Sequence, residues 1–238
     1  MSGWGTKRFW SETSVVATDG GFRISLDGRL VFTPAKAPLV LPTRAMADAV
    51  AGEWAAQEGK VDPRRMPVTC SANAAIDKVT PQFDEVVDLI AAYGGSDLLC
   101  YRAEYPQELI ARQAAAWDPP LVWAKQTFGA RLAVTSGIVP VAQSVEALDR
   151  LTAEVQCFSA FGLVALHDLV GLTGSLVLGL AAAAGYEPAE TIWSLSRIDE
   201  DWQAEQWGED AEATQTAGRK RDDFLHAHRF LSLCVERQ

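Results

Sequence analysis

The stretch FGLVALHDLVGLTGSLVLGLAAAA, residues 161–184, decides the fold of this chain. It contains one formally charged residue, Asp168, and its apolar side chains fall on every side of a helical wheel. A helix that is apolar all round must be enclosed by protein or by lipid. Polar and small residues dilute the run, and its final alanines add little transfer energy, which argues against lipid. We therefore predict that residues 161–184 form the central helix of a soluble helical domain.

Charge is distributed unevenly along the chain. The 238 residues carry a formal net charge of −10. Residues 1–80 contain ten Lys and Arg against eight Asp and Glu, whereas residues 81–238 contain eleven against twenty-three. Because the long acidic part repels phosphate groups, we expect neither nucleic acid nor an anionic membrane as a partner, and no insertion into a membrane. A basic protein surface is the partner that this charge favours.

The first part of the chain has the pattern of a small antiparallel sheet. Polar and apolar residues alternate before Asp27-Gly28, a strong signal for a two-residue hairpin turn, and the apolar run Leu30-Val31-Phe32 follows it. Thr43 then provides a hydroxyl that caps a helix, which we predict over residues 44–57. Trp54 lies on the apolar face of that helix, so we predict that it anchors the core.

Helical patterns dominate the rest of the chain. We predict helices over residues 68–79, 81–93, 144–157, 188–210 and 212–235. Further helices are expected to start at Pro106 and at Pro119-Pro120, because proline suits the first turn of a helix. A short hairpin is predicted around Gly137.

These patterns together define an α+β protein with two domains. A small N-terminal antiparallel β-rich domain, residues 1–75, is followed by a larger all-helical C-terminal domain, residues 76–238. The change from a period of two to helical patterns falls near the change in charge, which places the boundary between the two domains.

Residues that support enzyme chemistry are few and scattered. The four cysteines, at positions 70, 100, 157 and 234, have no paired spacing and are expected to be buried free thiols. His167 and Asp168 are adjacent on a predicted helix and point about 100° apart, so we interpret them as a satisfied polar pair and not as a catalytic couple. We expect no catalytic residue, no cofactor and no metal site. The alternative is a metal-dependent or general-acid enzyme that uses the acidic residues 199–212.

Residues 199–212 contain seven carboxylates and two tryptophans. On a helix, Asp201, Glu205 and Glu209 share one face, where like charges cost about 0.2–0.5 kcal/mol per pair. Only Arg197 is near enough in sequence to offset them. Large aromatic side chains beside charges are typical of a protein interface; the alternative is an acidic face in water with both tryptophans turned inward. The candidate partner-binding residues are Asp201, Trp202, Glu205, Trp207, Glu209 and Asp210.

The segment WQAEQWGED, residues 202–210, resembles the signature of the assembly chaperones of F-type ATP synthase that bind the α subunit of its soluble F1 catalytic sector. Other blocks that resemble this family follow in the family order over nearly the whole chain. They are residues 7–10, 26–29, 33–36, 53–54, 73–77, 97–103, 117–119 and 172–175. The resemblance implies a mainly β N-terminal domain, a helical C-terminal domain and a function without catalysis. It also implies that the carboxylates face a newly made α subunit, which the chaperone keeps from aggregating until the β subunit joins it.

The first residues bear on location and on a second candidate contact. The segment MSGWGTKRFW shows no apolar signal region, so we expect a bacterial cytoplasmic protein, or a mitochondrial matrix protein in trimmed form. Lys7, Arg8, Phe9 and Trp10 form either an arm that clasps a partner or a strand pinned by its aromatic side chains. We expect the free protein to be monomeric.

Overall fold

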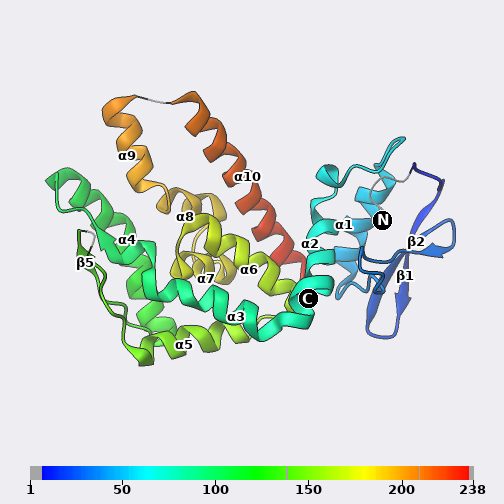
Figure 1. Ribbon diagram of the computed structural model, residues 1–238, viewed down its shortest axis with the longest axis horizontal. Coiled ribbons are helices and arrows are strands. Elements are labelled where there is room, and N and C mark those ends of the chain that lie inside the picture. The colour runs from blue at the N-terminus through cyan, green and yellow to red at the C-terminus, as the bar shows by residue number, and fades with distance from the viewer. Residues whose placement is uncertain (1–6, 138, 209, 236–238) are drawn as a thin grey trace. The chain divides into compact units, whose positions relative to one another are not determined.

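The computed structural model describes residues 7–137, 139–208 and 210–235 (Figure 1). Contacts divide these residues into two compact units. Unit 1 contains residues 7–83, 159–165 and 229–235, and unit 2 contains the described residues of 84–158 and 166–228. A small antiparallel sheet near the start of a largely helical chain confirms the predicted α+β fold class. The domain boundary after residue 75 stays a prediction.

The sheet of unit 1 has three antiparallel strands in the order β1-β2-β3. They are β1 (Thr13–Thr18), β2 (Gly21–Leu26) and β3 (Arg29–Leu30). Asp27 and Gly28 have φ angles of 47° and 81°, the left-handed values that a tight two-residue hairpin needs. The hairpin predicted at Asp27-Gly28 is therefore confirmed.

Helix α1 (Arg44–Ala55) packs against β1 and β2. The Thr43 hydroxyl accepts a hydrogen bond from the Met46 N–H at 3.1 Å, which confirms the predicted cap. Trp54 is partly buried against the core of unit 1, and its ring centroid lies 5.3 Å from that of Trp10 in an edge-to-face arrangement. The prediction that Trp54 anchors this core is confirmed.

The residues before β1 are pinned to unit 1. The Arg8 N–H donates to the Gly59 carbonyl at 2.6 Å, and the Arg8 guanidinium donates to the Gln57 carbonyl at 2.6 Å. Trp10 is buried, whereas Phe9 is exposed. Trp10 and Arg8 thus attach this segment to unit 1, whereas contact of residues 7–10 with a partner stays a prediction.

From residue 63 to residue 100 the chain is almost continuously helical. The elements are η1 (Pro63–Arg65), α2 (Pro67–Ala74), the π-helical η2 (Ala75–Val79), η3 (Thr80–Gln82), α3 (Phe83–Ala91), η4 (Ala92–Ser96) and η5 (Leu98–Cys100). The helices predicted over 68–79 and 81–93 are parts of this longer helical run.

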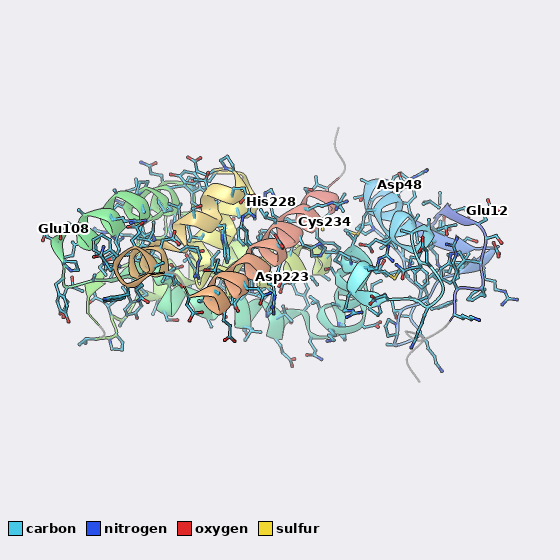
Figure 2. The ribbon with its side chains drawn as sticks, turned by 90° about the horizontal axis from the view of Figure 1, so that it is seen from above. Glu12, Asp48, Glu108, Asp223, His228 and Cys234 are labelled. Carbon is cyan, nitrogen blue, oxygen red and sulfur yellow. The ribbon has the colours of Figure 1, made fainter. Side chains whose placement is uncertain are left out.

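Longer helices make up most of the remaining chain. They are α4 (Gln107–Phe128), α5 (Val145–Gln156), α6 (Ala160–Thr173), α7 (Leu176–Ala184), α8 (Ala189–Leu195), α9 (Ile198–Trp207) and α10 (Ala211–Leu233). Figure 2 labels exposed Glu108 in the first turn of α4 and exposed Asp223 on α10, two of the acidic side chains on unit 2. A single helix was predicted over residues 188–210, but the chain forms two helices there, α8 and α9, which are separated at Ser196 and Arg197.

The central apolar stretch forms two helices and not the predicted single one. α6 ends at Thr173 and is followed by Gly174, whose φ of 69° is left-handed. α7 begins after Ser175, whose hydroxyl accepts a hydrogen bond from the Leu178 N–H at 3.0 Å. Two of the residues that dilute the run, Gly174 and Ser175, are thus a helix stop and a helix cap. The expected enclosure is confirmed, since the buried side chains include Leu163, Leu166, Leu169, Val170, Leu176, Val177 and Leu180.

The segment near Gly137 also differs from the prediction. A hairpin was expected there, but β5 (Thr135–Ser136) pairs in parallel with β4 (Tyr101–Arg102). Ile138, part of the predicted hairpin, lies outside the described residues. Parallel pairing joins segments that are distant in sequence, so local alternation does not reveal it.

Pro119 and Pro120 lie inside α4, where a helix start was predicted. Proline inside a helix costs about 3 kcal/mol because it lacks an N–H and clashes with the preceding turn. Here that turn is held from outside, since Trp117 is fully buried and its Nε1 donates to the Leu195 carbonyl at 2.7 Å. Tertiary packing therefore keeps α4 helical through both prolines.

Candidate functional site

Local features favour helix α9 but do not stabilise it alone. Asp199, Glu200 and Asp201 occupy its first turn, where carboxylates stabilise the positive end of the helix dipole. Gly208 follows its last residue with a φ of 91°. None of the ten residues of Ile198–Trp207 is buried. Because so short a helix is marginal alone, α9 depends on its neighbours for stability.

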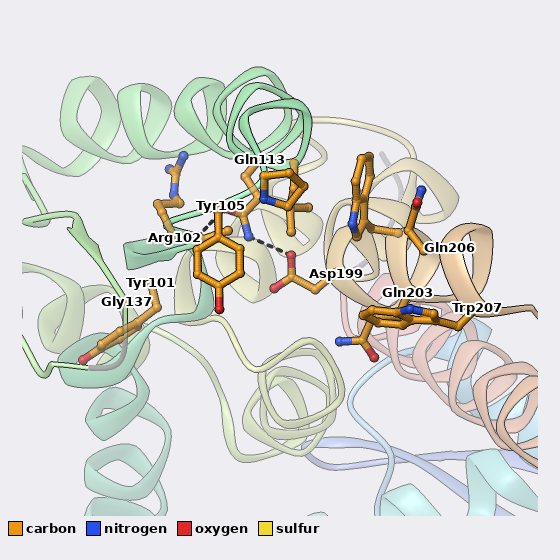
Figure 3. Close-up of a pocket in the computed structure, with 13 residues that line it drawn as sticks. Tyr101, Arg102, Tyr105, Gln113, Gly137, Asp199, Gln203, Gln206 and Trp207 are labelled. Carbon is orange, nitrogen blue, oxygen red and sulfur yellow. Dashed lines mark hydrogen bonds between the residues drawn. The ribbon is translucent and has the colours of Figure 1, made fainter.

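Two polar contacts attach α9 to α4. The Arg112 guanidinium donates to both carboxylate oxygens of Glu205, at 2.8 and 2.7 Å. The Gln113 amide donates to Asp199 Oδ1 at 2.7 Å (Figure 3). Gln113 is only 2% exposed, and its Oε1 accepts from the Ala103 N–H at 2.8 Å. An ion pair and a buried amide therefore hold α9 beside α4.

A pocket of about 610 Å³ lies beside this contact. Its lining includes Trp202 and Trp207 of α9, Tyr105 just before α4, and Leu109 in the first turn of α4. Asp199 lies between Tyr105 and Trp207 in Figure 3. The pocket thus combines aromatic walls with a carboxylate, which suits a ligand that is partly apolar and partly cationic.

Arg112 and Gln113 were missed by the sequence analysis. They are 93 and 86 residues from their partners Glu205 and Asp199, so no local spacing connects them. Arg197 is the cation near in sequence, but a distant arginine also offsets the carboxylates of α9. Arg112 pairs with Glu205, whereas Arg197 pairs with Glu200 at 2.7 Å.

The two tryptophans differ in exposure. Trp202 is half-buried against the pocket, whereas Trp207 is 79% exposed. Asp201 is exposed on the same helix, one turn before Glu205. The alternative in which both tryptophans turn inward is therefore wrong for Trp207.

The last two candidate residues follow α9. Asp210 caps α10, because its Oδ1 accepts from the Glu212 and Ala213 N–H groups at 2.8 and 2.9 Å. Glu209 lies outside the described residues. Asp210 therefore has a structural role of its own, which a substitution there would also disturb.

A buried carboxylate, that of Asp97, links η5 to the start of α7. Asp97 is fully buried and accepts hydrogen bonds from the Ser175 hydroxyl at 2.8 Å and from the Val177 and Leu99 N–H groups at 3.0 Å. Burial raises the pKa of Asp97 to about 6. The contact joins two of the sequence blocks noted above, residues 97–103 and 172–175.

Burial makes three of the four thiols less acidic. Burial raises the pKa of Cys100 and Cys234 to about 12, and burial also raises the pKa of Cys70. All four cysteines are free, but Cys157 is exposed, so the expectation that the thiols are buried is wrong at that position. His167 Nδ1 lies 2.9 Å from Asp168 Oδ1, a hydrogen bond that raises the pKa of the imidazole.

Within the described residues, no group of three or more His, Cys, Asp and Glu side chains is placed to hold a metal ion. Among the helices of that same part of the chain, none is both long and apolar enough to cross a membrane. Tryptophan is enriched in protein interfaces, and Trp207 is exposed on α9 beside an open pocket. These features are typical of a protein that binds another protein.

The sequence profile described as "ATP12 chaperone protein" matches residues 7–125. The chain belongs to the ATP12 chaperone family. ATP12 is a non-enzymatic assembly chaperone for the α subunit of the F1 sector of ATP synthase, which confirms the predicted family and function. The alternative of a metal-dependent or general-acid enzyme is therefore wrong.

Several known proteins are similar to this chain over nearly its full length. The crystal structure of Atp12 from Paracoccus denitrificans has a TM-score of 0.94 at 47% identity, covering 96% of this chain and 98% of that one. The crystal structure of the Atu1473 protein of Agrobacterium tumefaciens has a TM-score of 0.92 at 41% identity, covering 97% and 87%. Mitochondrial protein atp12 of Schizosaccharomyces pombe is 24% identical over 246 residues, covering 97% of this chain and 83% of the relative.

Proposed function

We propose that this protein binds the newly made α subunit of F-type ATP synthase through α9 and the start of α10. The contact residues are Asp201, Trp202, Glu205, Trp207, Glu209 and Asp210. The binding covers apolar surface on α that would otherwise self-associate, until the β subunit takes the chaperone's place. Exchange for β drives release, so the cycle needs no hydrolysis of nucleotide by the chaperone.

The exposure of Trp207 is the observation that supports this site most strongly. Its side chain is 79% exposed at the end of a helix with no buried residue in Ile198–Trp207, so it contributes little to the fold. Tryptophan is enriched among the residues that dominate binding energy in protein interfaces. Asp201 lies on the same helix and is exposed. A client surface with basic and apolar side chains complements this combination.

The charge of the chain supports the choice of partner. The net charge of −10 disfavours nucleic acid and anionic lipid and steers a basic protein surface toward the site. We infer that the free chaperone is a monomer. Its relatives include bacterial and mitochondrial proteins, so we place its action in the bacterial cytoplasm, or in the mitochondrial matrix for a trimmed form.

The test is capture of a freshly refolded α subunit by the purified chaperone, together with light scattering to follow aggregation of α. Trp207→Ala should leave the melting temperature unchanged and reduce capture by about tenfold or more, the effect of losing a strong interface residue. Leu89→Ala is the matched control, because Leu89 is also an exposed apolar residue on a helix, 54% exposed, but lies on α3. Its capture should equal wild type.

Two results would count against the proposal. If the wild-type protein neither captures α nor suppresses its aggregation, the proposed function is wrong. If Trp207→Ala captures α as well as Leu89→Ala does, the function stands but the surface is wrongly placed.

A further inference from the structure

The pocket between α4 and α9 has walls suited to a flat or cationic group. Trp202 and Trp207 present indole rings, and Tyr105, which is 80% exposed, presents a phenol ring. Leu109 adds an aliphatic surface. Aromatic faces are negative and attract cations, while their apolar character covers methylene groups. Figure 3 shows Tyr105 and Trp207 on opposite sides of Asp199.

The carboxylate of Asp199 is held in place through one of its two oxygens. Asp199 Oδ1 accepts a hydrogen bond from Gln113, which is itself buried and held by the Ala103 N–H. Among the described residues, no hydrogen bond reaches Asp199 Oδ2 and no cation pairs with the side chain. Since Asp199 is half-buried, its charge is less screened than that of the exposed carboxylates along α9.

Arginines on the neighbouring elements are engaged with other groups, and Arg197, two residues before Asp199, pairs with Glu200 at 2.7 Å. Arg102 lines the pocket, but its Nε donates to the Leu99 carbonyl at 2.7 Å and its Nη2 to Asp118 at 2.9 Å. Its guanidinium also stacks over the ring of Trp117. Arg112 is paired with Glu205. The pocket therefore keeps one carboxylate oxygen that lacks a cationic partner from its own walls.

We propose that this pocket binds an arginine side chain of the client, with Asp199 as its counter-ion and the aromatic walls as its stacking surfaces. A guanidinium fits better than an ammonium, because it is planar, stacks on rings and offers several donors to one carboxylate. The arginine stem lies against Leu109. The volume of about 610 Å³ also accommodates residues that flank the arginine.

A wholly apolar client side chain suits the pocket less well. It would shield Asp199 Oδ2 from water without giving it a hydrogen bond, and burying an unpaired charge is costly. This proposal rests on the proposed function and makes it more specific, since it names the chemistry of one client contact.

Substitutions on α9 test the proposal in the full-length protein. Asp199→Asn keeps the shape and an oxygen that accepts from Gln113, but it removes the charge. We expect its affinity for the α subunit to fall by about tenfold or more, as for loss of a charge-assisted hydrogen bond. Glu200→Gln is the matched control, since it removes a charge from the neighbouring, exposed residue, and its affinity should change less than threefold. Melting temperatures verify that both variants are folded.

Peptide titrations identify the ligand without the α subunit. Acetyl-Ala-Leu-Arg-Leu-Ala-amide should give heat in a calorimetric titration of the wild-type protein and none with Asp199→Asn. The same peptide with citrulline or leucine in place of arginine should bind at least about tenfold more weakly, because both lack the positive charge.

The outcomes separate the two proposals. If wild type captures α and Asp199→Asn captures it equally well, the arginine site is wrong while the chaperone function stands. If the leucine peptide binds as tightly as the arginine peptide, the site is an apolar one and the proposal is wrong. If wild type fails to capture α, the proposed function fails, and the peptide titration alone decides whether the pocket takes arginine.

Discussion

Replacing Glu205 with glutamine separates the binding role of α9 from its structural role. The substitution keeps the shape of the side chain and removes one negative charge. It also weakens the contact with Arg112, whose nitrogen lies 2.8 and 2.7 Å from the two carboxylate oxygens. If repulsion between Glu205 and the other carboxylates of α9 were the only effect, the melting temperature of Glu205→Gln would hold or rise. Weakening the ion pair with Arg112 opposes that gain.

The magnitude follows from the exposure of the pair. The side chains of Arg112 and Glu205 are 33% and 53% exposed, so they form a surface salt bridge worth about 0.2–1 kcal/mol. Relief of the repulsion from Asp201, one turn earlier, returns about 0.2–0.5 kcal/mol. The net loss of unfolding free energy is therefore below about 0.8 kcal/mol. Because about 1 kcal/mol shifts the melting temperature of a chain this size by about 2–4 °C, we expect a change within about 3 °C.

Capture of the α subunit should fall much more than stability. A charge-assisted hydrogen bond at an interface contributes about 1.5–3 kcal/mol, which corresponds to about 10- to 150-fold in affinity. Thermal melting and α capture are measured on the same preparations, at low and high salt. Arg112→Gln is the comparison, since it breaks the same pair but keeps the negative charge of Glu205. Because the repulsion from Asp201 remains, Arg112→Gln should melt at or below Glu205→Gln, and it should capture α better than Glu205→Gln does.

The reasoning would be refuted if Glu205→Gln melted far below wild type while its folded fraction captured α normally. Glu205 would then be a structural residue, and its assignment to the binding surface would be wrong.

Three further predictions concern stability. Trp54→Ala should cost about 3 kcal/mol or more in urea unfolding, since Trp54 packs against the core and Trp10; an unchanged midpoint would contradict this. Gly179→Ala should cost about 1–3 kcal/mol in the same assay, because the new Cβ meets the side chain and backbone of Val170, and a wild-type midpoint would disprove the close packing. Burial raises the pKa of Asp97 to about 6 from an ordinary 3.8, so the folded protein holds this proton more tightly than the unfolded chain. The stability that this proton provides is present below about pH 4 and is lost as the pH rises through about 6. The unfolding free energy of wild type, measured relative to that of Asp97→Asn, should therefore fall from pH 4 to pH 7. A difference that does not change with pH would contradict this prediction.

Several parts of the fold are determined by the sequence itself. The Asp27-Gly28 turn and the Thr43 cap depend on residues within a few positions, so local chemistry is enough to predict them. The apolar run over 161–184 had to be enclosed, because no face of it is polar. The sequence also contains the signal for the break at Gly174, a glycine followed by a serine that caps the next helix. This signal was not recognised because the apolar pattern continues on both sides of it.

Only the tertiary structure decided how the site is built. Arg112 and Gln113 meet Glu205 and Asp199 across 93 and 86 residues, and these two contacts place α9 against α4 and form the pocket beside it. The acidic segment could be identified from its composition, but the use of each carboxylate could not. Glu205 pairs across helices, Asp210 caps α10 and Asp199 lies in the pocket. Such roles depend on which helices pack together, and packing is a property of the whole chain that no local spacing encodes.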